Sequence, residues 1–433
     1  MFLSAAAAVL FPFVVSYDLP TNAVNMAHIL DAPAGKYGQV FVKDGRFATS
    51  KGPIRFNATN LTGPANFPSH DYAERMADRL ARFGINCVRL HFMDSAYGYG
   101  NFMQTTQACL VVAASVSEFT FDEAKLEKLD YLVNEFKERG IYVNVNLHVA
   151  RLVALKGATW FDRGIIDSEK DYARRLLSHV NPYTGLSYAK DPVVAMIELN
   201  NEDAIFNNCY KSVKEGKAPF VRFIMATESA YLEEMKRCLK DEIATAAPIA
   251  ASQATYSPCH VQAALDYLDH HEYWCHPSPV NKEWKILDAP MVNDPAANCI
   301  VWAASRRVKG KPFTISEFNT PYPNSYGAEG QLLLRAYGAF QDWNGVFQYS
   351  YDNRTDSEPD HVEYFFSMVA RTDVLAHLPA CSAMFLRGDV KPSPNLLAVG
   401  AEKNAFVDRF VKTKKIFDDS HTASGGKVPY AEG

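Results

Sequence analysis

The stretch AERMADRLARFGINCVRLHF (residues 73–92) decides the fold together with KLEKLDYLVNEFKERGIYVNVNLH (residues 125–148). In both, apolar residues recur at the spacing of an amphipathic helix, a glycine follows, and a strand begins at once. Gly84 and Gly140 stand where a helix needs a left-handed residue to end. A repeated helix–glycine–strand unit is typical of alternating α/β architecture with parallel strands.

Short polar residues mark where these two helices begin. Asp71, with Glu74 three residues later, has the spacing of a capping box, in which side chains bond the free backbone N–H groups of the first turn. Asp122 predicts the N-cap of the second helix.

Polar residues alternate with apolar ones along the predicted strands. In residues 193–202 the odd positions up to Leu199 are apolar, while Glu198, Asn200 and Glu202 share the opposite face. Strands of an open sheet covered by helices on both faces are continuous apolar runs, so this alternation favours a closed barrel. The polar faces then converge on an active site at the C-terminal ends of the strands.

Eight strands can be counted along the chain. They are expected at residues 54–60, 87–92, 142–148, 193–202, 248–254, 266–273, 313–318 and 345–351. The predicted fold class is α/β, a (β/α)8 TIM barrel with a small N-terminal β cap and a C-terminal tail. We expect the N-terminal segment and β-hairpin cap over residues 1–50, the barrel over residues 51–400, and a C-terminal helix and tail or linker over residues 401–433.

Composition limits the partners of the chain. With 48% hydrophobic and 21% charged residues it is an ordinary globular sequence, which excludes a disordered or fibrous protein. The net charge is −5 and basic residues cluster only at 306–307 and 412–415, so we expect no nucleic-acid partner. The eight cysteines show no C-x-x-C pair and no zinc-type spacing, and we expect neither a metal nor a cofactor.

The N-terminus, MFLSAAAAVLFPFVV, is apolar. It is too short to span a bilayer of about 30 Å and lacks a charged start, so we expect no membrane partner. A trimmed signal peptide and a segment that packs on the protein body both stay open. The expected location is secreted or periplasmic, in a bacterium.

Two glutamates end predicted strands. Glu202 ends the fourth strand and Glu317 the seventh, and a barrel brings such positions into one pocket. Hydrolysis of a glycosidic bond requires two facing carboxyl groups, one that protonates the leaving oxygen and one that attacks or activates water. Two structural carboxylates, each paired with arginine or lysine, are the alternative, since such pairs are common outside active sites.

The sequence around these glutamates carries a family signature. VVAMIELNNEDA (residues 193–204) places Asn201 directly before Glu202, and KPFTISEFNTP (residues 311–321) places Glu317 at the end of a short apolar strand. These stretches resemble clan A glycoside hydrolases, the retaining β-glycosidases that include the family 5 cellulases and mannanases. The resemblance implies that Glu202 is the general acid/base, that Glu317 is the nucleophile and that Asn201 bonds the sugar 2-hydroxyl.

Further positions between about residues 35 and 350 match family 5 in order. Arg89 corresponds to the arginine that keeps the nucleophile ionised, and His148 to the histidine that lines the sugar subsite. His271 and Tyr273 correspond to the H-x-Y element, whose tyrosine can donate to the nucleophile. The remaining candidates for substrate binding are His91, Asn146, Trp274 and Tyr349.

The sequence departs from family 5 at the eighth strand. The family usually has a tryptophan there as the floor of the cleavage subsite, whereas FQYSYDN (residues 347–353) offers Tyr349 or Tyr351. Two other roles stay open. Trp274 either stacks on a sugar or packs in the core, and His91 binds substrate hydroxyls or makes a structural hydrogen bond.

The sequence therefore predicts a retaining β-glycosidase that acts on an oligo- or polysaccharide of the β-glucan or β-mannan type by double displacement. A non-catalytic carbohydrate-binding barrel is the alternative, because tyrosines replace the expected tryptophan. A metal-dependent hydrolase is a third hypothesis. It is disfavoured because His270 and His271 are consecutive strand residues that face opposite ways and no H-E-x-x-H spacing exists.

Overall fold

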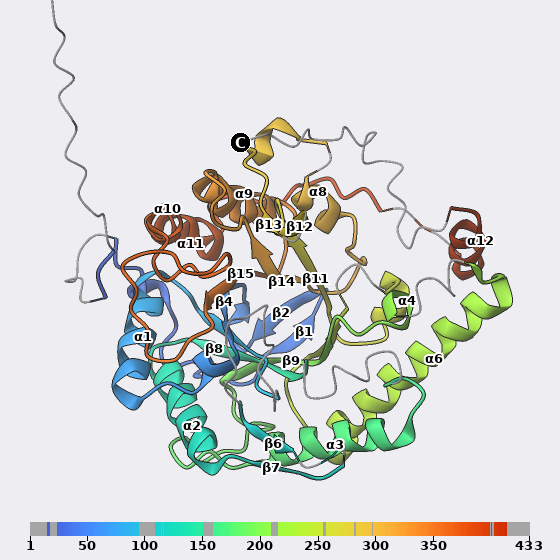
Figure 1. The fold of residues 1–433 in the computed structure, drawn as a ribbon, viewed down its shortest axis with the longest axis horizontal. Coiled ribbons are helices and arrows are strands. Elements are labelled where there is room, and N and C mark those ends of the chain that lie inside the picture. Colours follow the sequence, from blue (N-terminus) through green and yellow to red (C-terminus); the bar gives the residue numbers. More distant parts are fainter. Residues whose placement is uncertain are drawn as a thin grey trace, which may run out of the picture.

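A computed structural model describes residues 15–17, 24–94, 109–113, 115, 117–149, 159–208, 215–253, 257–280, 283–296, 298–398, 400 and 402–413. Eight parallel strands form the central sheet, in the order β10-β9-β8-β5-β4-β15-β14-β11 (Figure 1). The strands are β4 (Phe56–Thr62), β5 (Cys87–His91), β8 (Tyr142–His148), β9 (Val194–Asn201), β10 (Ile249–Ser252), β11 (Leu268–Tyr273), β14 (Phe313–Asn319) and β15 (Gly345–Asp352). Each overlaps a predicted strand, so the (β/α)8 barrel is confirmed. The apolar N-terminal stretch up to residue 14 and the tail from residue 414 lie outside the described residues.

The sheet is nearly closed into a barrel, with β10 and β11 at its two edges. No strand pairing joins these two edges within the part of the chain that the structure describes. Instead, the Asp266 N–H donates to the Ile249 carbonyl over 2.8 Å. The Ser252 hydroxyl donates to Asp269 Oδ2 over 2.6 Å. We call this junction between β10 and β11 the seam.

Helices surround the strands (Figure 1). The longer ones are α1 (His70–Arg82), α2 (Glu123–Glu138), α3 (Arg163–Ser178), α6 (Ala218–Arg237), α9 (Gly327–Phe340), α11 (Leu378–Arg387) and α12 (Lys403–Thr413). The shorter ones are α4 (Ile205–Asn208), α7 (Cys259–Gln262), α8 (Cys299–Ala304), α10 (Thr372–Leu375), a π-helical turn (Cys238–Glu242) after α6, and 3-10 turns at Ala27–Ile29, Gly63–Asn66 and Met291–Asn293. Among the helices described, none combines the length and apolarity that a bilayer crossing requires.

In the described part of the chain, three small antiparallel sheets accompany the barrel. The first precedes the barrel in the chain and consists of β1 (Phe41–Lys43), β2 (Arg46–Thr49) and β3 (Gly52–Pro53). Its first two strands lie in the segment expected to form the N-terminal hairpin. The other two sheets pair β6 (Val111–Ala113) with β7 (Phe119–Phe121) and β12 (Ser278–Val280) with β13 (Glu283–Lys285). The proposed division of the chain near residues 50 and 400 stays a prediction.

One helix start differs from its prediction. The N-cap of α1 is Ser69, whose hydroxyl accepts from the Tyr72 N–H, so Asp71 lies inside the first turn and the predicted capping box is wrong. A carboxylate there is still favourable, because it faces the positive end of the helix dipole. Asp122 does cap α2, and its Oδ1 accepts the backbone N–H groups of Ala124 and Lys125.

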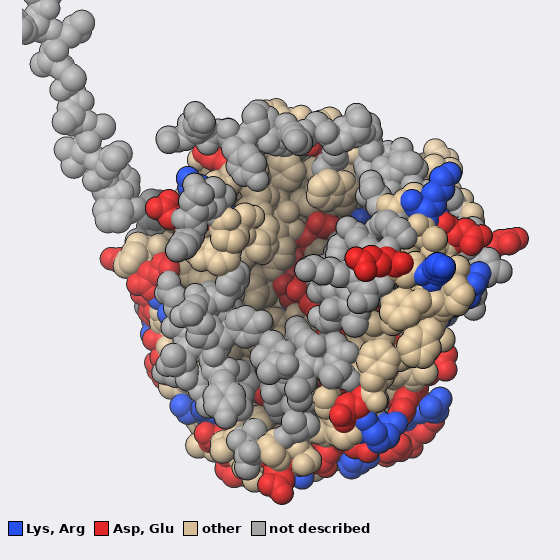
Figure 2. Space-filling view, turned by 45° about the vertical axis from the view of Figure 1, so that its right-hand side comes forward, with Lys and Arg blue, Asp and Glu red and all other residues tan. Residues whose placement is uncertain are grey.

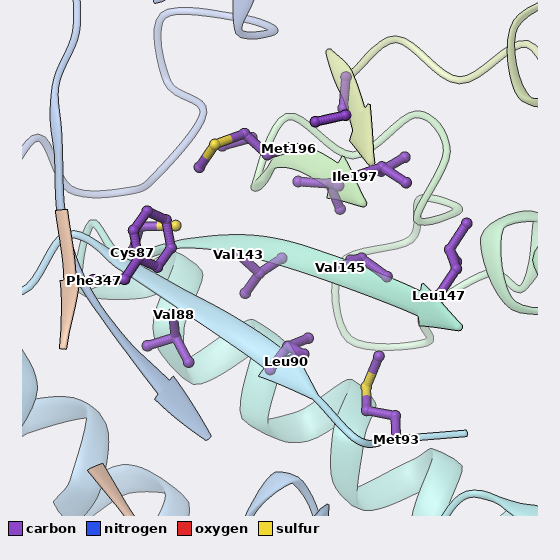
Figure 3. Close-up of a cluster of buried hydrophobic side chains, with 14 of the residues drawn as sticks. Cys87, Val88, Leu90, Met93, Val143, Val145, Leu147, Met196, Ile197 and Phe347 are labelled. Carbon is purple, nitrogen blue, oxygen red and sulfur yellow. The ribbon is translucent and has the colours of Figure 1, made fainter. Parts of the chain in front are cut away.

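The two faces of the strands differ as predicted. Apolar side chains of β5, β8 and β9 form a buried cluster, of which Figure 3 labels Val88, Val145 and Ile197 among others. The alternate positions of the same strands are polar and equally buried, among them Arg89 and Glu198, both 0% exposed. Burying charged groups is costly unless they are paired and hydrogen-bonded. The barrel interior must therefore contain a connected polar network.

Candidate active site

Glu202 and Glu317 come from strands far apart in the sequence. Glu317 lies within β14, and Glu202 directly follows β9. Glu202 has a left-handed backbone, with φ of 49°, and its N–H donates to the Ser252 carbonyl over 2.8 Å. Positive φ is uncommon for a residue other than glycine, and such conformations cluster at functional sites.

The two carboxylates face each other beside His271. One oxygen of Glu202, one oxygen of Glu317 and one ring nitrogen of His271 all lie within 4.8 Å of one another. The Glu202 side chain is 34% exposed, whereas that of Glu317 is 7% exposed. Figure 2 shows a hollow in the molecular surface with acidic side chains at its bottom and uncharged residues along much of its wall.

Arg89 holds Glu317 from inside the barrel. Its Nη1 donates to Glu317 Oε1 over 2.8 Å, its Nε donates to Glu198 Oε2 over 2.8 Å, and its Nη2 donates to Asn201 Oδ1 over 2.7 Å. Burial lowers the pKa of Arg89, but Glu198 and Glu317 outweigh burial and the net shift is upward. A permanent cation therefore faces the side chain of Glu317 directly.

Tyr273 and His271 contact the two carboxylates from β11. The Tyr273 hydroxyl donates to Glu317 Oε2 over 2.5 Å. Burial and the charge of Glu317 raise the pKa of Tyr273 well above its ordinary value, so this hydroxyl keeps its proton. His271 Nδ1 lies 2.8 Å from Glu202 Oε1 and 3.6 Å from Glu317 Oε1.

Glu198 is a site component that the sequence analysis did not assign to the site, although it belongs to the quoted stretch VVAMIELNNEDA. Asn144 and Asn146 donate to its two oxygens over 2.6 and 2.9 Å, and Arg89 is its counter-charge. Asn146 also contacts His91, with 3.0 Å between Oδ1 and the His91 Nδ1, and is fully buried. The structure thus places Asn146 beneath the carboxylates, where it supports Glu198 and His91. His91 Nε2 itself lies 3.6 Å from Glu317 Oε1.

Two further predicted site residues are buried and contact other groups. His148 is buried beside Asp94 and Glu169, with each of its ring nitrogens 3.4 Å from one carboxylate oxygen. Burial lowers the pKa of His148, but Glu169 and Asp94 outweigh burial and raise it. Trp274 is 7% exposed in a hydrophobic cluster, and its indole N–H donates to the Ala289 carbonyl over 2.7 Å. Of its two open roles, this placement favours core packing.

Tyr349 lies against the site where family 5 usually has a tryptophan. Its ring centroid is 5.9 Å from those of His91 and Tyr273, whereas the hydroxyl of Tyr351 accepts from Arg79, 3.1 Å away. Phe366 packs 5.5 Å from Tyr349 and 5.3 Å from Tyr273, and the sequence analysis missed it. The available signal was the aromatic run EYFF, residues 363–366, which follows the last strand.

Glu202, His271 and Glu317 also satisfy the spacing of a metal site. The oxygens of Glu317, however, already accept hydrogen bonds from Arg89 and Tyr273. A cation next to the guanidinium of Arg89 would meet electrostatic repulsion. The geometry therefore favours acid–base and nucleophilic chemistry by the two carboxylates.

An α/β barrel with two facing carboxylates at its strand ends defines the class of TIM-barrel glycoside hydrolases. Residues 50–330 match the family model described as Cellulase (glycosyl hydrolase family 5), a span of more than half of the chain. The chain belongs to glycosyl hydrolase family 5. It is a glycosidase that hydrolyses O-glycosyl bonds, and its substrate is a carbohydrate.

Solved structures share the fold at low identity. The endo-β-1,4-mannanase from Thermotoga petrophila is 16% identical, with a TM-score of 0.58 and 78% of each chain covered. The endo-1,4-β-mannanase from Rhizomucor miehei is 13% identical, with a TM-score of 0.59, 81% of this chain and 100% of that chain covered. A family 5 mannosidase from the same organism is 15% identical, with a TM-score of 0.59 and 81% and 98% covered. A comparison with curated protein sequences found no match.

Proposed function

We propose that the chain is a retaining β-glycosidase that cleaves an oligo- or polysaccharide of the β-mannan or β-glucan type. The proposal rests on one observation, which is that carboxylate oxygens of Glu202 and Glu317 approach within 4.8 Å at the barrel mouth. Retaining enzymes hold their carboxyl groups roughly 5–5.5 Å apart, whereas inverting enzymes need a wider gap for a water molecule.

In the first step Glu317 attacks the anomeric carbon and the bond to the leaving oxygen breaks. Glu202 donates its proton to that oxygen, so the aglycone leaves as an alcohol. Arg89 and Tyr273 hold both oxygens of Glu317, so the attacking group is fixed in place before the substrate binds. Asn201, which is held by Arg89, lies one residue before Glu202 and is the candidate for binding the 2-hydroxyl of the sugar.

In the second step Glu202, now a carboxylate, removes a proton from water. The oxygen of this water attacks the anomeric carbon, and the bond to Glu317 breaks, so Glu317 leaves as a carboxylate. Because the carbon is inverted twice, the product keeps the substrate's configuration. The substrate class is proposed from the mannanase and mannosidase names of the structures described above. A panel of β-mannan, β-glucan, galactan and xylan with aryl β-glycosides would identify the preferred sugar.

The first prediction tests this mechanism. Proton NMR of the product formed in the first minutes should show the β anomer before mutarotation. Glu317→Ala and Glu202→Ala should each lower kcat by roughly 10³-fold or more, because each removes a reacting group. Both should keep the wild-type circular dichroism spectrum.

The matched control is a carboxylate on β11 that has no part in the proposed reaction. Glu272 contacts His270 rather than the two catalytic candidates, with 2.9 Å between Oε1 and Nε2. Glu272→Gln should therefore retain most of the activity. An inverted product, full activity in either alanine variant, or activity abolished by a chelator and restored by a metal ion would contradict the proposed mechanism.

A further inference from the structure

Asp269 is a buried carboxylate that the mechanism above does not use. It lies on β11 two residues before His271 and is 2% exposed. Its Oδ2 accepts the hydroxyl protons of Ser252 over 2.6 Å and of Ser316 over 2.5 Å, and its Oδ1 accepts that of Thr314. Three neutral hydroxyl groups, one from β10 and two from β14, thus converge on one buried charge.

The direction of these hydrogen bonds fixes a proton on His271. A serine hydroxyl has one proton, and Ser252 and Ser316 both give theirs to Asp269. Their oxygens can then only accept from His271 Nε2, which lies 2.6 Å from Ser252 Oγ and 3.0 Å from Ser316 Oγ. Nε2 therefore carries a hydrogen, and Nδ1 is the ring atom that faces Glu202.

We propose that Asp269 is a positioning residue which, through Ser252 and Ser316, keeps His271 as an imidazolium that donates its Nδ1–H to Glu202. The inference rests on the proposed role of Glu202 as the acid/base. In this role Asp269 affects proton transfer by Glu202 without contacting the substrate.

The charges around His271 support this assignment. Three carboxylates surround the His271 ring: Glu202 at the end of β9, Glu317 on β14 and Asp269 on the same strand as His271. Arg89, on β5, contacts the far side of Glu317. Burial lowers the pKa of His271, but the three carboxylates outweigh burial and raise it to about 10. A cation at this place stabilises the carboxylate form of Glu202, which the second step requires while Glu317 is bound to the sugar as an ester.

The test is to titrate His271 in the wild-type protein and in Asp269→Asn. The protonation of its two ring nitrogens is monitored by ¹⁵N NMR. The wild-type ring should be doubly protonated at pH 8. In the variant a neighbouring negative charge is lost, so the pKa of His271 should fall by roughly 1–3 units. Where His271 has lost its proton in the variant, Glu202 lacks the cationic neighbour that favours its ionised form, so the alkaline limb of kcat/KM should move to higher pH. The acid limb should stay, since His271 is protonated there in both proteins.

The control is Asp130→Asn, which changes an equally buried aspartate outside the site. Asp130 pairs with His179 over 2.7 Å, so this variant should change the titration of His179 and leave both limbs unmoved. A wild-type His271 that is neutral at pH 8 would overturn the proposal without any variant. So would an unchanged His271 titration in Asp269→Asn, whatever its activity. Since the titration needs no substrate, it is decided separately from the glycosidase mechanism.

Discussion

At the scale of single residues, Arg89 connects the parts of the site. Its guanidinium reaches Glu198, Glu317 and Asn201 at once and is completely buried. A planar group with five donors can serve several acceptors in fixed directions, which the point charge of a lysine cannot do. The same contacts that hold Glu317 ready for attack therefore also compensate the buried charge of Glu198.

Arg89→Lys should accordingly damage both stability and catalysis. Leaving buried carboxylates without their hydrogen bonds should cost about 3 kcal/mol of the free energy of unfolding, measured by urea denaturation. The value of kcat should fall by about 100-fold, because Glu317 loses a donor aimed at it. Arg163→Lys is the control, since Arg163 is 55% exposed in its ion pair with Glu234 and should cost less than about 1 kcal/mol. Equal losses in the two variants would contradict this account.

Much of this site could be predicted at the residue scale, with one limit. Strand alternation showed that Glu198, Asn146 and His148 face inward. Alternation gives the face of a strand but not the depth below the barrel mouth or the sideways neighbour. The structure supplies those neighbours: Asn146 donates to Glu198, and His148 lies beside Glu169. A contact of either residue with the substrate stays a prediction.

At the scale of elements, glycines fix how two helices lead into their strands. Gly140 ends α2 with φ of 79°, and a Cβ at this position would lie 3.0 Å from the Ala32 nitrogen. The same residue therefore meets two requirements, a left-handed turn and a close approach of the N-terminal segment.

Gly140→Ala separates these two requirements when it is compared with Gly38→Ala. Gly38 has φ of 80°, but a Cβ there would have no neighbour within 4 Å. We expect Gly38→Ala to cost about 1 kcal/mol of unfolding free energy for the left-handed backbone alone. Gly140→Ala should cost about 1–3 kcal/mol more because of crowding. Equal melting temperatures of the two variants would show that Ala32 moves aside without cost.

Elements with strong local signals could be predicted, and those that depend on distant contacts could not. Both glycine-terminated helices and the alternating strands that follow them were predicted from periodicity, and the other strands were placed along the chain from their short runs. The start of α1 was misplaced because serine and aspartate are both good N-caps, and the sequence alone does not rank Ser69 against Asp71. The packing of Phe366 on Tyr349 joins a loop to a strand and has no periodic signal.

At the scale of the whole molecule, the barrel has one weak junction. Among the described residues, β5 and β8 pair with strands on both sides, whereas β10 pairs only with β9 and β11 only with β14. Amide groups at unpaired strand edges open more easily than those inside a sheet. The seam should therefore be the first part of the sheet to separate.

Hydrogen exchange measured by mass spectrometry would test this expectation. Peptides that cover β10 and β11 should exchange at least about tenfold faster than peptides that cover β5 and β8, because local opening needs less free energy than global unfolding. Uniform protection across the four strands would mean that the side-chain bonds at the seam are as effective as strand pairing.

The position of Ser252 has a consequence for the thermal inactivation of this enzyme. The hydroxyl that fastens one edge of the cylinder to the other is the same hydroxyl that contacts the ring of His271. When β10 separates from β11, the hydrogen bond between Ser252 and the ring of His271 is therefore broken as well. We therefore expect enzymatic activity to be lost when β10 separates from β11, before the rest of the barrel unfolds.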